Sequence, residues 1–135
     1  MNTVLIFSHP DIGASLRTAA LMTLKILPCE VITINCPQDV EPEHIVINAL
    51  KTLENIKSDI GLVIFSDIFG ATPHNIASLV AKRTLHKTLV ISGINLPMLI
   101  RTLNYITLPL QAVCEKAIEG GLAGICEKNG NTYDS

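Results

Sequence analysis

The sequence predicts an α/β fold with a doubly wound, mainly parallel sheet of four strands in the order 2-1-3-4 and helices on both faces. Continuous apolar runs alternate along the chain with segments whose apolar residues recur at helical spacing. The composition is 48% hydrophobic but only 4% aromatic and 16% charged, which is typical of aliphatic strands covered on both faces. At 135 residues the chain is expected to form one domain, residues 1–135.

The first strand is predicted at "TVLIF", residues 3–7, because the run is apolar without interruption. The segment Asp11–Leu27 then has an apolar stripe at helical spacing, and Pro28 is expected to end that helix. Its inward positions are Ile12, Leu16, Ala19, Ala20, Leu24 and Leu27. "EVITI", residues 30–34, predicts the second strand, and the loop "NCPQD" follows it.

Pro42 suits the first turn of a second helix, since proline lacks the N–H that goes unused there. The inward positions of that helix are Ile45, Ala49, Leu50, Leu53 and Ile56. "GLVIFSD", residues 61–67, predicts the third strand, Pro73 opens a third helix, and "TLVISG", residues 88–93, predicts the fourth strand.

The last third of the chain predicts two short helices, "NLPMLIRTLNYI" at 95–106 and "LPLQAVCEKAIEGG" at 108–121. "LAGICEK" at 122–128 follows as a fifth strand at the edge of the sheet. The glycines in this region provide a pliable connection that could cross to a second subunit. The low charge of the chain also suggests that a partner subunit covers apolar surface.

Charge and cysteine usage exclude several classes of protein. The net charge of −2, with no basic cluster, argues against nucleic-acid binding. The four cysteines form no C-x-x-C pair and have no histidine at ligand spacing, so we expect reduced thiols, no metal and no cofactor. No segment reaches the roughly 18 apolar residues of a membrane span. The first apolar run is too short for a signal peptide, so a cytoplasmic location without membrane insertion is expected.

His9 and Asp67 each come at the end of a predicted strand, in "LIFSHPDIG" and "GLVIFSD". In the order 2-1-3-4 the first and third strands are neighbours, roughly 4.8 Å apart, and the crevice beyond their carboxyl ends is where such folds bind ligands. An aspartate there can accept a hydrogen bond from one imidazole nitrogen and leave the other nitrogen free as a nucleophile or base. We therefore expect His9 and Asp67 to form a catalytic pair.

The stretch "IFGATPHN" after Asp67 suits a phosphoryl group. Gly70 allows a tight turn, Thr72 is the expected N-cap, and the N–H groups of Gly70, Ala71 and Thr72 would face the crevice at the positive end of a helix. Another helix starts beside His9, near Asp11. A phosphorylated imidazole would then sit between two helix N-termini.

Each of these features has a plain structural alternative when taken alone. His9 could be a polar loop residue, Asp67 an N-cap, and Gly70–Pro73 an ordinary loop that leads into a helix. Their convergence at one crevice favours a functional site. The remaining candidates are weaker. His74 either borders the crevice or lies on the surface, and His44 and His86 are expected to face solvent. The segment "SGINLPM" at 92–98 has either a structural or an interface role, and the four cysteines are expected to be buried hydrophobes or surface thiols: Cys29, Cys36, Cys114 and Cys126.

The chain resembles the enzyme IIA component of the mannose-type branch of the bacterial phosphoenolpyruvate:sugar phosphotransferase system. The matching blocks are the opening strand with its histidine, "SDIFGATPHN" and "SGINLPML", in the family's order and at about its spacing. The resemblance covers essentially the whole chain.

This resemblance implies that His9 accepts a phosphoryl group from the histidine-containing phosphocarrier protein and passes it to a IIB component. Asp67 corresponds to the carboxylate that holds the imidazole. No metal is implied, because the donor is itself a phosphohistidine. The family also implies a homodimer that exchanges a C-terminal edge strand, which in this chain would be Leu122–Lys128.

The chain departs from the family pattern in three ways. Pro10 follows the histidine where many members have glycine, and Thr72 replaces a common serine while keeping the hydroxyl. No IIB domain follows, so a separate acceptor is expected, in sugar uptake or its regulation. Two other functions stay open. The first is a regulatory binding module in which phosphorylation of His9 controls the affinity for a target protein. The second is a flavodoxin-like domain that binds a small ligand, but the opening loop lacks the Gly-rich or Ser/Thr-rich phosphate-binding sequence of such a domain. The phosphocarrier subunit of dihydroxyacetone kinase shares the fold but lacks the G-x-[ST]-P pattern.

Overall fold

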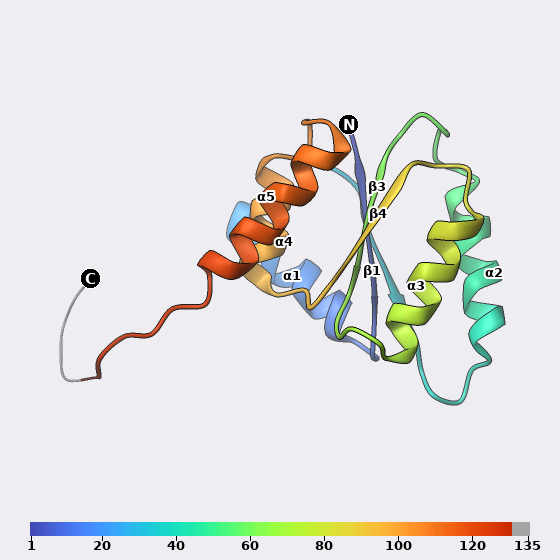
Figure 1. Ribbon diagram of the computed structural model, residues 1–135, viewed down its shortest axis with the longest axis horizontal. Helices are drawn as coiled ribbons and strands as arrows, with labels where there is room; N and C mark the ends of the chain where they lie inside the picture. The colour runs from blue at the N-terminus through green and yellow to red at the C-terminus, as the bar shows by residue number, and fades with distance from the viewer. Residues whose placement is uncertain (131–135) are drawn as a thin grey trace.

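Among the residues that the structure describes, four parallel strands form the central sheet in the order β2–β1–β3–β4, as the sequence predicts (Figure 1). The computed structural model describes residues 1–130. The strands are β1 (Thr3–Ser8), β2 (Val31–Asn35), β3 (Leu62–Ser66) and β4 (Thr88–Ser92). The register places Phe7 of β1 opposite Ile34 and Ser66, so the carboxyl ends of β2, β1 and β3 meet at one edge of the sheet.

In the described part of the chain, residues 1–130, five helices cover the two faces of the sheet. They are α1 (Ile12–Leu24), α2 (Pro42–Leu53), α3 (Thr72–Arg83), α4 (Leu96–Asn104) and α5 (Leu110–Ala123). Helices α1, α4 and α5 lie on one face, and α2 and α3 lie on the other (Figure 1). This arrangement is the doubly wound fold that the alternation of strands and helices predicts.

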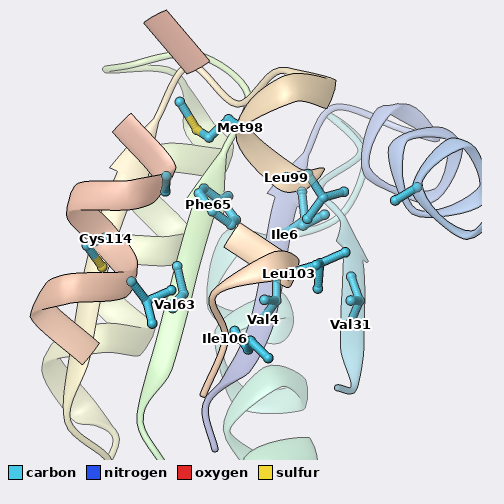
Figure 2. Close-up of a cluster of buried hydrophobic side chains, with 13 residues drawn as sticks. Val4, Ile6, Val31, Val63, Phe65, Met98, Leu99, Leu103, Ile106 and Cys114 are labelled. Atoms are coloured by element: carbon cyan, nitrogen blue, oxygen red, sulfur yellow. The ribbon is translucent and has the colours of Figure 1, made fainter. Parts of the chain in front are cut away.

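The position of β1 in the centre of the sheet explains why its sequence is a continuous apolar run. Val4 and Ile6 point into the core beneath α1, α4 and α5, where Figure 2 shows Ile6 beside Leu99 and Val4 beside Ile106. Leu5 and Phe7 point to the opposite core, beneath α2 and α3. All four side chains are fully buried, because successive residues of a strand face opposite sides and both sides are covered.

Helix α1 ends at Leu24, three residues earlier than the apolar stripe predicts. Lys25 adopts a left-handed conformation with φ of 70°, and its backbone N–H donates to the carbonyl of Leu21. A residue in this conformation ends a helix. Pro28 therefore lies beyond the helix and does not form its boundary.

The C-terminal strand predicted at 122–128 is wrong at its start, because Leu122 is in the last turn of α5. The glycines before it serve helix packing: a Cβ on Gly121 would lie 2.6 Å from the terminal methyl of Met98 on α4. The smallest residue thus allows α4 and α5 to approach closely. Residues 125–130 form no strand within the single chain, and their pairing with a second subunit stays a prediction.

Candidate active site

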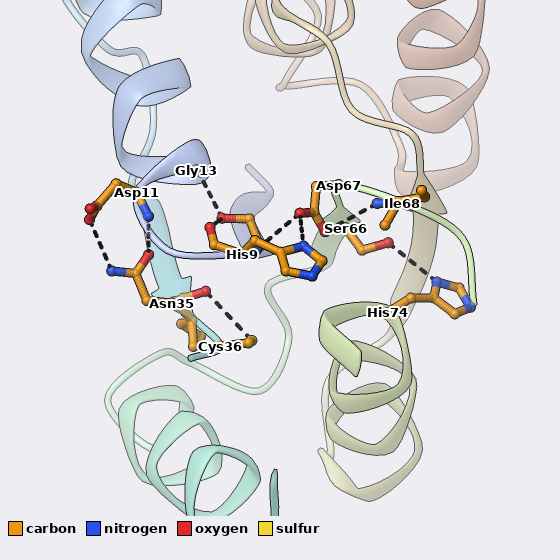
Figure 3. Close-up of polar contacts among 11 residues, drawn as sticks. His9, Asp11, Gly13, Asn35, Cys36, Ser66, Asp67, Ile68 and His74 are labelled. Carbon is orange, nitrogen blue, oxygen red and sulfur yellow. Dashed lines mark hydrogen bonds and ion pairs between the residues drawn. The ribbon is translucent and has the colours of Figure 1, made fainter. Parts of the chain in front are cut away.

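His9 and Asp67 lie together beyond the ends of β1 and β3, as the strand order predicts (Figure 3). The imidazole Nδ1 of His9 is 2.6 Å from Oδ2 of Asp67. The same carboxylate oxygen accepts the backbone N–H of His9 at 2.9 Å, and Oδ1 accepts the N–H of Ile68 at 3.1 Å. Three donors therefore hold one carboxylate, which in turn holds the imidazole through both its ring and its backbone.

The contact with Asp67 determines which nitrogen of His9 is available. An ionised carboxylate only accepts hydrogen bonds, so Nδ1 carries the proton and the lone pair of a neutral ring is on Nε2. No hydrogen bond occupies Nε2 of His9 within residues 1–130. The His9 side chain is 42% exposed and that of Asp67 only 10% exposed. The arrangement presents one nitrogen nucleophile to solvent and keeps the carboxylate behind it.

The pKa of Asp67 results from opposing effects. Partial burial raises it, because burial disfavours the charged form. The hydrogen bonds from the backbone and the imidazole of His9, together with the charge of the imidazole, more than compensate and lower the pKa below its ordinary value of 3.8. Asp67 is therefore ionised near neutral pH and can balance a positive charge that develops on the ring.

The loop after His9 is fixed by two residues from strand ends. The buried hydroxyl of Ser8 donates to the carbonyl of His9 at 2.7 Å and accepts the N–H of Gly13 at 2.9 Å. Asp11 has a left-handed backbone with φ of 70°, and its N–H donates to Oδ1 of Asn35 at 3.0 Å. The amide of Asn35 donates back to the Asp11 carboxylate at 3.3 Å. Ser8 and Asn35 are not predicted as site residues from the sequence, where their position at strand ends is the only signal.

These contacts change the expectation that two helix N-termini face the phosphoryl group. Three N–H groups at the start of α1 already have partners, since Asp11 donates to Asn35, Gly13 to Ser8, and Ile12 to the carbonyl of His9 at 3.3 Å. They hold the histidine loop. These three N–H groups are therefore not free for a ligand, whereas the N–H of Ala14 donates to no protein acceptor within residues 1–130.

The start of α3 differs from that of α1. Gly70 turns the chain with φ of 83°, a conformation that favours glycine. Within residues 1–130, the N–H groups of Gly70, Ala71 and Thr72 donate to no protein acceptor. These three amides form a loop of free donors that begins three residues after Asp67.

The N-cap of α3 is Ala71, so the expectation that Thr72 caps this helix is wrong. Because Gly70 makes the turn, Ala71 already has the extended backbone of a capping residue, and Thr72 is the first helical residue. No side chain caps this end.

His74 lies in the first turn of α3 and is bound on two sides. Its Nδ1 is 3.3 Å from Oγ of Ser66, the fully buried last residue of β3. Its ring lies 4.7 Å from the ring of Phe69, at an interplanar angle of 46°. His74 therefore borders the loop that carries the free amides.

The other histidines lie away from this site. His44 is exposed on α2, as expected. His86 does not simply face solvent: it is half-buried, with Nδ1 2.9 Å from the hydroxyl of Thr84 and Nε2 3.0 Å from the carbonyl of Ile56. The reason is that the loop before β4 folds back on the end of α2.

The block 92–98 has a clear structural role. Asn95 caps α4 by accepting the N–H of Met98 at 2.9 Å, and its amide donates to the carbonyl of Gly121 at 3.2 Å. Gly93 has φ of 81°, which turns the chain between β4 and α4. This block therefore joins α4 to both β4 and α5.

Burial raises the pKa of three cysteine thiols from 9.0 to about 11, and we refer to them as the shielded thiols. They are Cys29, Cys36 and Cys114. Cys36 is near the site: the charge of Asp67 adds to the effect of burial on its pKa, and its backbone N–H donates to the carbonyl of Ser8 at 2.9 Å. A thiol with so high a pKa is protonated at neutral pH and is a poor nucleophile.

Two further findings concern the part of the chain that the structure describes, residues 1–130. It contains no cluster of three or more His, Cys, Asp or Glu side chains suited to a metal ion. None of its helices combines the length and the apolar character needed to cross a bilayer.

Comparison with known proteins gives one family and several similar structures. The family model described as PTS system fructose IIA component, where PTS is the phosphotransferase system, matches residues 3–118. No curated protein matches the chain significantly.

Three solved structures illustrate the similarity of fold. The phosphotransferase system component EIIA from Streptococcus agalactiae has a TM-score of 0.82 at 20% identity, over 94% of this chain and 97% of that one. The mannose/sorbose specific IIA subunit from Enterococcus faecalis has a TM-score of 0.81 at 14% identity, over 98% of each chain. A sigma-54 interaction domain protein from Enterococcus faecalis has a TM-score of 0.69 at 10% identity, over 91% of each chain.

Proposed function

This chain belongs to the family of PTS system fructose IIA components, and we propose that it is a phosphocarrier that holds a phosphoryl group on Nε2 of His9. The observation that carries this proposal is the 2.6 Å contact between Nδ1 of His9 and Oδ2 of Asp67. The contact keeps the ring proton on Nδ1, which donates to the carboxylate, and leaves Nε2, on a side chain that is 42% exposed, free to react. A nucleophile whose partner is held by a third group is the pattern of covalent catalysis.

Two transfers make up the proposed cycle. The histidine-containing phosphocarrier protein donates first: its nitrogen–phosphorus bond breaks as a bond forms between phosphorus and Nε2 of His9. In the second transfer, the bond to Nε2 breaks as the phosphoryl group passes to a separate IIB component. The proton on Nδ1 stays in place throughout, and the carboxylate of Asp67 balances the positive charge that develops on the ring.

The free amides at the start of α3 would bind the phosphoryl oxygens. Gly70, Ala71 and Thr72 follow Asp67 closely in the chain, and their N–H groups have no acceptor within residues 1–130. Backbone donors at the positive end of a helix stabilise the charge that spreads over the equatorial oxygens during phosphoryl transfer. This mechanism needs no metal ion, because both donor and acceptor are protein side chains.

A homodimer is part of the proposal. The free edge of β4 borders a groove of about 400 Å³ whose lining includes Val90, Ile118 and Leu122. Leu122 and Ile125 are 67% and 73% exposed in the single chain. A C-terminal segment exchanged with a second copy would cover these side chains and pair with the open edge of the sheet. We place this single phosphocarrier domain, residues 1–135, in the cytoplasm.

A second candidate function is a regulatory module whose phosphorylation on His9 changes its affinity for a target protein. The sigma-54 interaction domain protein, which shares the fold, supports this alternative. The two functions use the same residues, and they differ in whether the phosphoryl group moves on. Purified IIB proteins of the mannose type would therefore accept label from the phosphorylated chain if it is a carrier, and would not if it is only a switch.

The experiment that tests the proposal is phosphorylation in a reconstituted system. The chain is incubated with labelled phosphoenolpyruvate, enzyme I and the histidine-containing phosphocarrier protein, and we expect one acid-labile, base-stable phosphate per chain. His9→Ala should take up none, whereas His44→Ala, which removes an exposed histidine on α2, should behave like the unmodified chain. Equal labelling of the His9→Ala variant would refute the proposal.

A further inference from the structure

Ser66 and His74 close the base of the loop that carries the free amides. Ser66 directly precedes Asp67, and His74 comes two residues after Thr72. The 3.3 Å contact between Oγ of Ser66 and Nδ1 of His74 therefore joins the two ends of the segment 67–72 (Figure 3). A loop whose ends are tied has fewer conformations available to it.

Ser66 is a rigid anchor for this contact. It is fully buried, and its carbonyl accepts the N–H groups of Gly93 and Ile94 at 3.0 and 3.1 Å, which fastens β3 to the end of β4. His74 is the only hydrogen-bond partner of the Ser66 hydroxyl within residues 1–130. Because a buried hydroxyl without a partner is unfavourable, the imidazole is held at Ser66 and does not turn to solvent.

Phe69 gives His74 a second contact, at the tip of the same loop. Phe69 is 77% exposed, yet the centre of its ring lies 4.7 Å from that of the His74 imidazole, within the range of a favourable aromatic pair. Gly70, next to Phe69, adopts a left-handed conformation and brings no side chain that could restrain the loop. The ring contact therefore restrains the residue before Gly70, while the hydrogen bond from the N–H of Asn75 to the carbonyl of Ala71 at 3.1 Å holds the other end of the three amides.

We propose that His74 is a positioning residue for phosphoryl transfer, which holds the segment 67–72 at its base through Ser66 and at its tip through Phe69. This inference rests on the proposed function, because that segment contains both the carboxylate behind His9 and the amides that would bind the phosphoryl oxygens. His74 itself does not touch the reacting atoms. It orders the groups that do.

Two substitutions separate the two contacts of His74. His74→Phe keeps an aromatic ring for Phe69 but removes the hydrogen-bond partner of Ser66. His74→Asn keeps a polar group that can reach the Ser66 hydroxyl but removes the ring. The control is His44→Asn on α2, where the side chain is exposed and lies outside the site.

The first measurement does not depend on phosphoryl transfer. Amide NMR of the unphosphorylated chain should show faster hydrogen exchange and shifted resonances at Gly70, Ala71 and Thr72 in both His74 variants, and no change in the control. If these amides are unaffected in both variants, the inference is wrong even where His9 is phosphorylated normally. If the unmodified chain is not phosphorylated at His9, the proposed function fails, while the effect on the loop is still measured.

The second measurement is the rate of phosphoryl transfer from the phosphocarrier protein. We expect kcat to fall roughly tenfold in each His74 variant, since misplacement by a fraction of an ångström costs less than the 100-fold typical of 1 Å. The KM for the donor protein should change less than twofold, because His74 is not expected to contact it. Unchanged kcat in both variants would overturn the inference.

A variant at Ser66 controls for the destabilisation that an unpaired buried hydroxyl would cause in His74→Phe. Ser66→Ala removes the buried hydroxyl, so no unpaired group is left when His74→Phe is added to it. We expect Ser66→Ala to lower kcat as well, and the double variant to be no slower than His74→Phe alone, because both changes break one contact. Fully additive losses, with intact folding by circular dichroism, would show that His74 acts by another route and would refute the proposed link through Ser66.

Discussion

Replacing Asp67 with asparagine tests the arrangement behind His9 most directly. The carboxylate receives three N–H donors: Nδ1 and the backbone N–H of His9 at Oδ2, and the backbone N–H of Ile68 at Oδ1. An amide has only one oxygen, so its NH₂ group must face one of these donors. Asp67→Asn therefore loses at least one hydrogen bond as well as the negative charge.

The expected loss in transfer rate follows from the charge on the imidazole. As Nε2 of His9 bonds to phosphorus, the ring becomes positive, and a hydrogen bond to a charged partner contributes about 1.5–3 kcal/mol. At 1.36 kcal/mol per factor of ten, Asp67→Asn should lower kcat roughly 10- to 150-fold. We expect the lower part of this range, because the His9 side chain is 42% exposed and water screens part of the interaction.

The assay is quenched-flow transfer of labelled phosphate from the phosphocarrier protein to the chain. Asp59→Asn, an exposed aspartate outside the site, is the matched control and should transfer at the normal rate. The reasoning would be refuted if Asp67→Asn, folded by circular dichroism, transferred as fast as the control. In that case the carboxylate would have no part in the reaction.

The same substitution should also change how the free energy of unfolding depends on pH. The pKa of Asp67 is below its ordinary value of 3.8 in the folded chain, so the ionised carboxylate stabilises the fold above that pH. This contribution is lost as the pH falls through the lowered folded pKa. The difference in free energy of unfolding between the unmodified chain and Asp67→Asn should therefore be largest near neutral pH and shrink in acid, measured by urea denaturation at each pH.

Three further predictions follow from other parts of the fold. Gly13→Ala should lower the free energy of unfolding in urea by about 1–3 kcal/mol, because the new Cβ would lie 3.0 Å from the Ile6 side chain, whereas Gly130→Ala, in open space, should have no effect. The free energy of unfolding should also fall as the pH rises from 9 towards 11, since the shielded thiols ionise at 9.0 when unfolded but at about 11 when folded, and replacing them with alanine should flatten this dependence. Removal of residues 124–135 should lower the dimer content in sedimentation equilibrium, and a full-length chain that stays at 14.6 kDa at micromolar concentration would exclude the dimer.

The sequence predicts the pairing of His9 with Asp67 because it depends on strand order alone. Once β1 and β3 are neighbours, residues that follow both strands must meet at the same edge. The contact between Ser66 and His74, or between Asp11 and Asn35, is harder to predict. Each depends on side-chain direction and on the path of a turn, neither of which a strand pattern determines. The same limit explains why Thr72 looked like an N-cap when a turn at Gly70 makes Ala71 the cap.

The two helix starts at the site have different partners, and this difference suits a carrier of phosphoryl groups. At the start of α1 the N–H groups of Asp11, Ile12 and Gly13 donate to Asn35, His9 and Ser8, so the loop that holds the imidazole needs no ligand to be ordered. The N–H groups at 70–72 have no acceptor within residues 1–130. Donors that are fixed but unpaired can exchange water for phosphoryl oxygens without rearrangement of the backbone. If His9 carries the phosphoryl group, α1 therefore keeps the nucleophile in place in both states, and α3 provides the donors whose partners change.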